Sequence, residues 1–165
     1  MGGSLNTAAR EQFMRLALEQ ARRGMAAGGP PVGACVVRED KVVAAAHNEV
    51  IAELDPTAHA EMQALRRACR EERSLLLTGA DLYVTLEPCA MCLTACHYTG
   101  IENIFFGAPI AALDVHTKNE LCVSADLLYS GQSDAPQLHP ALLEDECAAL
   151  LDEWSQTIPQ RFSKP

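Results

Sequence analysis

The sequence DLYVTLEPCAMC occupies residues 81–92 and joins a short apolar run to a pair of cysteines. Residues 81–86 have the length and composition of a buried strand, and Glu87-Pro88 interrupts it. Proline is favoured at the first position of a helix, so we expect a helix from Pro88 to about residue 98. Cys89 and Cys92 would then project from one face at the start of that helix.

This cysteine pair permits two chemistries. A helix N-terminus favours thiolates, and two thiolates three residues apart can reach one zinc ion. Thioredoxin-like redox sites also place C-x-x-C between a strand and a helix. Taken alone, Cys89 and Cys92 therefore leave a metal site and a redox site open.

His59-Ala60-Glu61 favours the metal site. Thr57 is expected to cap a helix over residues 57–73, which places His59 and Glu61 in its first turn. His59, Cys89 and Cys92 make three protein ligands and leave the fourth tetrahedral position of one zinc ion for water, as in a catalytic site. The order H-x-E followed by P-C-x-x-C is typical of zinc deaminases that act on nucleobases.

Glu61 has the chemistry of the proton carrier in such a site. Zinc lowers the pKa of its bound water toward about 7, which makes hydroxide available to attack an amidine carbon. A carboxylate beside that water can accept its proton, pass it to the ring nitrogen and assist the departure of ammonia. We therefore predict a zinc-dependent hydrolytic deaminase with Glu61 as the catalytic residue.

The rest of the chain indicates an α/β fold. Residues 7–27 have helical periodicity after Asn6, and two apolar runs at 33–37 and 41–46 flank a polar turn. A strand is expected at 101–106 and a closing helix at 142–154, while 107–139 has no assignable pattern. The prediction is a three-layer α/β/α sandwich with a mixed sheet, in a single domain over residues 1–165 whose residues 1–6 are flexible.

Composition restricts the location and the partner. Seven cysteines without a recognisable secretion signal argue for reduced thiols, so we expect a cytoplasmic protein. The chain has 13 Lys and Arg against 22 Asp and Glu, a net charge of −9. A phosphate backbone would be repelled by such a chain unless its cations were clustered, so we expect no nucleic-acid partner.

Residues 55–61 and 82–92 resemble the cytidine deaminase superfamily, in particular its bacterial guanine deaminases and tRNA adenosine deaminases. The resemblance extends over roughly residues 10 to 154. It implies a five-stranded mixed sheet, one catalytic zinc ion and a homodimer. It also implies contacts with the substrate from four residues: Asn48, Ala60, Val32 and Glu87.

The sequence leaves several substrates and functions possible. The negative charge favours a free purine base or nucleoside, guanine-type first, as a small-molecule substrate. A tRNA-specific adenosine deaminase and a deaminase of a non-purine heterocycle are the alternatives within enzymes. A thiol redox protein and a zinc-stabilised binding module without catalysis are the alternatives outside deamination.

Overall fold

The computed structural model describes residues 6–117 and 121–157, which form a five-stranded mixed sheet in the order β2-β1-β3-β4-β5. β1 pairs antiparallel with β2 and β3, whereas β3-β4 and β4-β5 are parallel. The strands are β1 Gly33–Arg38, β2 Lys41–His47, β3 Ala80–Leu86, β4 Asn103–Ala108 and β5 Gln137–His139. The expected flexible segment, apart from Asn6, lies outside the described residues.

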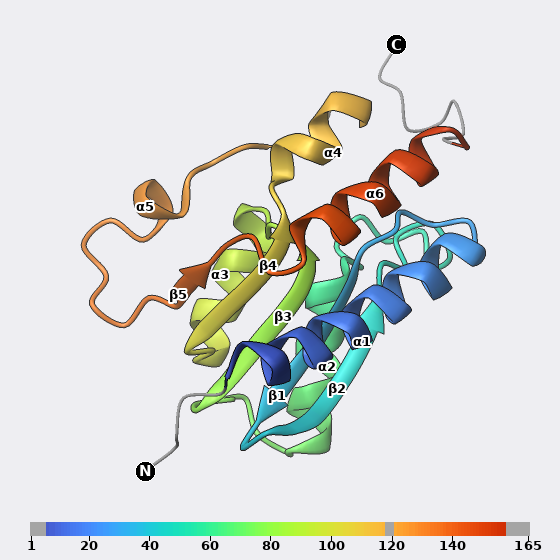
Figure 1. Cartoon of the computed structure of the whole chain (residues 1–165). Coiled ribbons are helices and arrows are strands. Elements are labelled where there is room, and N and C mark those ends of the chain that lie inside the picture. The colour runs from blue at the N-terminus through green and yellow to red at the C-terminus, as the bar shows by residue number, and fades with distance from the viewer. Residues whose placement is uncertain (1–5, 118–120, 158–165) are drawn as a thin grey trace.

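Helices cover both faces of this sheet, which confirms the predicted three-layer α/β/α sandwich. α1 and α6 lie on one face, and α2 and α3 lie on the other (Figure 1). The helices are α1 Thr7–Ala26, α2 Ala60–Glu71, α3 Ala90–Thr99, α4 Ile110–Thr117, α5 Ala125–Leu128 and α6 Glu144–Ser155. Among the described residues, no helix combines the length and apolar content that a membrane span requires.

The packing of α1 and α6 against the sheet depends on two glycines. A Cβ atom on Gly33 would lie 2.0 Å from the carbonyl oxygen of Ala17 in α1. A Cβ atom on Gly107 would lie 2.2 Å from Sγ of Cys147 in α6. Both helices therefore approach the strands more closely than any side chain at these positions would permit.

The start of α2 corrects one prediction. Thr57 does not cap this helix, which begins at Ala60 with His59 as its N-cap. Oδ1 of Asp55 instead accepts hydrogen bonds from the backbone N–H and the hydroxyl of Thr57, each at 2.8 Å. This turn competes with helix initiation, so the chain stays non-helical for three more residues.

Other boundaries also differ from the sequence prediction. α3 begins at Ala90 instead of Pro88, β4 lies two residues after the expected strand, and α6 begins two residues late. The unassigned stretch 107–139 contains α4, α5 and β5. These three elements are short, and α4 has no clear polar face, so none has the periodicity by which longer elements are recognised.

Candidate active site

Three side chains meet at one end of the parallel strands. Nδ1 of His59 lies 3.7 Å from Sγ of Cys89 and 3.6 Å from Sγ of Cys92, and the two sulfurs are 3.8 Å apart. Among the described residues, these three form the one group of His, Cys, Asp or Glu donors spaced to hold a metal ion. Cys96, one turn after Cys92, is not part of it.

The donor spacing fits zinc. A zinc ion with Zn–S bonds of about 2.3 Å and a Zn–N bond of about 2.0–2.1 Å at tetrahedral angles places its sulfurs about 3.8 Å apart and each sulfur about 3.6 Å from the nitrogen. The three measured distances agree with these values. One imidazole and two thiols therefore stand where three corners of a zinc tetrahedron would be, and the protein supplies no fourth donor among the described residues.

Two helix N-termini bring these donors together. His59 and Cys89 are the N-cap residues of α2 and α3, both in extended backbone, and Cys92 is the third residue of α3. The hydrogen bond shared by the two sulfurs, together with hydrogen bonds from His59 and from the Cys92 backbone, lowers the pKa of Cys89 to about 4. The Cys92 sulfur, the other partner of that bond, has its pKa raised. Cys89 is thus held ready as a thiolate ligand.

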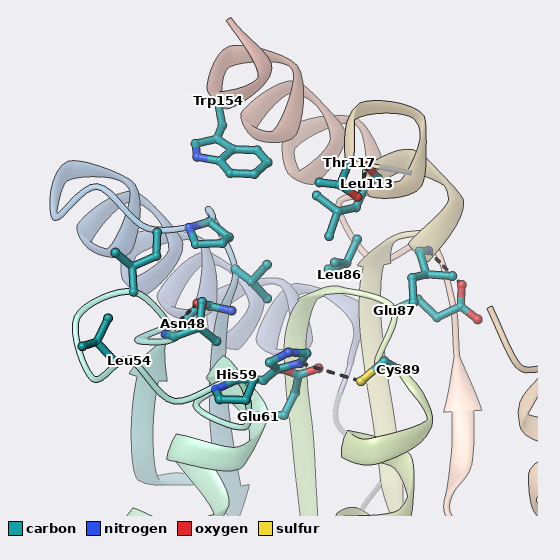
Figure 2. Close-up of a pocket in the computed structure, with 16 residues that line it drawn as sticks. Asn48, Leu54, His59, Glu61, Leu86, Glu87, Cys89, Leu113, Thr117 and Trp154 are labelled. Atoms are coloured by element: carbon teal, nitrogen blue, oxygen red, sulfur yellow. Dashed lines mark hydrogen bonds between the residues drawn. The ribbon is translucent and has the colours of Figure 1, made fainter. Parts of the chain in front are cut away.

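Glu61 is the second residue of α2, in its first turn, and lies beside the metal donors. It is 4% exposed, and burial raises the pKa of its carboxyl group above the ordinary range, although the nearby His59 opposes the rise. A buried carboxyl group with a raised pKa holds a proton more readily than an exposed one, which suits a group that accepts and returns protons. Figure 2 shows Glu61 beside His59 and directed at the same cavity.

His59, Cys89 and Glu61 lie at the floor of a cavity of about 490 Å³, while Cys92 is buried behind them (Figure 2). Of the residues that the resemblance places at the substrate, three line this cavity: Asn48, Val32 and Glu87. Ala60 is fully buried in the first turn of α2 and is not among the lining residues. The substrate contacts of all four stay predictions.

Asn48 and Glu87 have defined hydrogen-bond partners. Oδ1 of Asn48 accepts from the backbone N–H of Val50 at 3.1 Å, and Oε2 of Glu87 accepts from the backbone N–H of Ile110 at 3.0 Å. Ile110 is the first residue of α4, so the Glu87 carboxylate binds the N-terminus of that helix. Glu87 therefore fixes one wall of the cavity.

The sequence prediction missed part of the cavity wall. Ile110, Leu113 and Thr117 of α4 and Trp154 of α6 line it, and Figure 2 shows Leu113 and Thr117 across the cavity from Asn48. Trp154 is 3% exposed and lies more than sixty residues after the last metal donor. The sequence placed Trp154 in the predicted closing helix. Its position at the cavity depends on how α6 packs back over the sheet.

The chain was compared with known proteins. Residues 7–108 match the family model described as the cytidine and deoxycytidylate deaminase zinc-binding region. The tRNA-specific adenosine deaminase of Bacillus subtilis (strain 168) is 40% identical, covering 92% of this chain and 91% of that relative. The tRNA-specific adenosine deaminase of Aquifex aeolicus (strain VF5) is 46% identical, covering 60% of this chain and 66% of that relative.

Two solved structures resemble the fold. One comes from work on A-to-I editing by tRNA:A34 deaminases at the wobble position of transfer RNA, with a TM-score of 0.73, 35% identity, and coverage of 84% of this chain and 98% of that chain. The other is a guanine deaminase from Nitrosomonas europaea, with a TM-score of 0.81, 26% identity, and coverage of 88% and 84%. The backbone thus fits both kinds of enzyme, while the sequence is more similar to the first.

These relatives overturn two predictions. The guanine-type small-molecule substrate and the absence of a nucleic-acid partner are both wrong, because relatives at 40–46% identity are tRNA-specific adenosine deaminases. Net charge misled the prediction because it counts every residue equally, whereas screened charges act over about 10 Å. The homodimer stays a prediction.

We predict that the purified protein binds one zinc ion per chain and that zinc protects two thiols. In a native protein treated with an alkylating reagent, Cys122 is exposed and should react at once, whereas Cys89 and Cys92 should react only after a chelator removes the metal. Mass spectrometry of the labelled peptides measures this, with Cys122 as the internal control. Equal labelling of all three before chelation would contradict the metal site.

Proposed function

The chain belongs to the family defined by the cytidine and deoxycytidylate deaminase zinc-binding region, and from this we propose that it deaminates adenosine to inosine in transfer RNA. The chemistry is supported by the three clustered metal donors, two of which line one cavity together with the buried Glu61. The substrate is supported by the observation that a tRNA-specific adenosine deaminase matches 92% of the chain at 40% identity.

The cavity suits a base that has left its stack. Most of its walls are apolar, with Val32, Leu86 and Leu113 around the metal donors. Enzymes that act on a base take it out of the stack and hold it between apolar or aromatic side chains. The single-stranded loop of a transfer RNA provides such a base at little cost in pairing energy.

Zinc in this site supplies a Lewis acid that lowers the pKa of a coordinated water toward about 7. Glu61 provides the proton transfers. Its carboxylate accepts a proton from the attacking water, delivers one to the ring nitrogen beside the reacting carbon, and assists departure of ammonia. Its burial excludes competing solvent, so the proton stays between this carboxylate and the substrate.

Asn48 orients the base in this proposal. Because the backbone N–H of Val50 fixes Oδ1 by one hydrogen bond, the Nδ2 amino group is the donor that Asn48 can offer to the cavity. Asn48 therefore donates, and its partner on the substrate is an acceptor such as a ring nitrogen of adenine. The amide is 8% exposed, so a substrate without this acceptor would leave a buried donor unpaired.

The substrate proposal is tested with RNA. The zinc-loaded protein should form inosine in an anticodon stem-loop with adenosine at the wobble position, and should release little ammonia from free guanine, guanosine or adenosine. Chromatography of the digested RNA measures inosine, and a coupled assay measures ammonia.

The matched control is the same stem-loop with its adenosine moved into the paired stem, where the base cannot leave its stack freely. We expect no inosine there. Ammonia from guanine together with an unmodified stem-loop would contradict the proposed substrate.

Replacing the proton carrier should stop turnover and keep the metal. Glu61→Gln has the same shape but cannot accept a proton, so we expect kcat for inosine formation to fall by at least about 10²-fold. Zinc content, measured by atomic emission, should stay at the wild-type value. The exposed carboxylate of Glu102 provides a control, since Glu102→Gln should retain full activity. A Glu61 variant with wild-type kcat would remove it from the mechanism.

Replacing the donor of Asn48 should weaken catalysis without unfolding the loop. Asn48→Asp retains an oxygen for the Val50 N–H but has no amino group to donate, so we expect kcat/KM to fall by about tenfold or more. The melting temperature, measured by circular dichroism, should change little. A variant that retained the wild-type kcat/KM would show that the substrate does not bind through this amide.

A further inference from the structure

The loop between β2 and α2 presents an exposed leucine at the mouth of the cavity. Leu54 is 90% exposed, the most exposed of the large apolar side chains in the described residues, and it also lines the cavity. Figure 2 shows it on the same side as Asn48, away from Trp154. Leu54 is outside the hydrophobic core, so its apolar side chain contributes little to folding.

The loop that carries Leu54 is held by its own hydrogen bonds. The backbone N–H groups of Glu53 and Asp55 donate to the carbonyl oxygens of Glu49 and Val50, and Glu49 N–H donates to Ala58 at 2.9 Å. Both carboxylate oxygens of Glu49 also accept from Arg67 in α2, at 3.1 and 3.0 Å. Leu54 is therefore presented on a braced loop instead of a freely moving one.

The backbone at Leu54 is in the left-handed region, with φ of +52°. This conformation is unfavourable for a residue with a Cβ atom, and glycine would adopt it without strain. A leucine here is thus unfavourable twice, through its backbone and through its exposed apolar surface. A contact with a ligand would account for a side chain that folding does not require.

The charges near the cavity indicate what that contact is. No lysine or arginine is among the cavity-lining residues of the described chain. The two arginines in the middle of α2 are already engaged, Arg66 with Thr57 and Gln63, and Arg67 with Glu49. No cationic side chain of the described residues therefore lines the cavity mouth, where Leu54 offers an apolar surface.

We propose that Leu54 contacts the base of the nucleotide next to the target adenosine. This inference rests on the proposed function. When the target base leaves its stack, the neighbouring base loses a stacking partner and exposes an apolar face. A leucine fixed at the mouth of the cavity can cover that face, as stacking platforms do in proteins that bind single strands.

The proposal is tested with two substitutions at Leu54 and an anticodon stem-loop. Leu54→Gly removes the contact and relieves the backbone, so KM should rise about fivefold while kcat stays within about twofold, because the contact is equal in ground and transition states. The melting temperature should not fall. Leu54→Met restores apolar volume and should return KM to within about twofold of wild type.

Leu75→Ala is the matched control, since Leu75 is 84% exposed in the connection between α2 and β3 and does not line the cavity. Its KM should equal that of wild type. A Leu54→Gly enzyme with wild-type KM, or a rise of equal size in Leu75→Ala, would overturn the proposal.

Abasic nucleotides identify the partner. In wild type, an abasic site on either the 5′ or the 3′ side of the target should raise KM about fivefold, and the same abasic site should add nothing in Leu54→Gly. If each abasic site raised KM by the same factor in wild type and in Leu54→Gly, the contact would be refuted. If zinc-loaded wild type made no inosine in the intact stem-loop, the proposed function would fail and this inference with it.

Discussion

The structure depends on one constraint: three metal donors from the starts of two helices must occupy three corners of the same tetrahedron. His59 precedes α2, while Cys89 and Cys92 begin α3, and their mutual distances of 3.6 to 3.8 Å leave little freedom between the two helices. β3 lies directly before the cysteine pair, so the sheet aims that pair at the histidine. The fold thus forms a metal centre where two positive helix ends coincide, which also favours thiolate ligands.

The sequence predicted this centre because its chemistry is local. Cys89 and Cys92 are separated by one helical turn, and His59 and Glu61 are two residues apart, so spacing placed the members of each pair together, and the order H-x-E before P-C-x-x-C joined the two pairs. The start of α2 was wrong because Asp55 binds Thr57 and delays the helix. Trp154 and the residues of α4 could not be placed at the cavity, since their position results from tertiary packing across long separations.

Net charge was a poor guide to the partner for a related reason. Several arginines are paired with carboxylates, as in Arg15 with Glu146 and Arg38 with Glu72, so formal charge does not describe the groups that a ligand would meet. The active-site cavity is mostly apolar and carries no basic side chain in the described chain. Under the proposed function, selection there would depend on shape, apolar contact and the amide donor of Asn48, none of which appears in a count of charges.

One loop links recognition to catalysis. Asn48 begins it and His59 ends it, and the hydrogen bond from Glu49 N–H to the Ala58 carbonyl joins the two ends. The separation of Asn48 from the metal donors is therefore set at the base of the loop and not at its tip. Val50 and Asp55 belong to this frame, because the Val50 N–H donates to the Asn48 amide and Asp55 holds the turn before α2, so change in shape and polarity is confined to residues 51–54. Leu54 lies at that tip, so the proposed contact with a neighbouring nucleotide could vary while Asn48 and His59 keep their places.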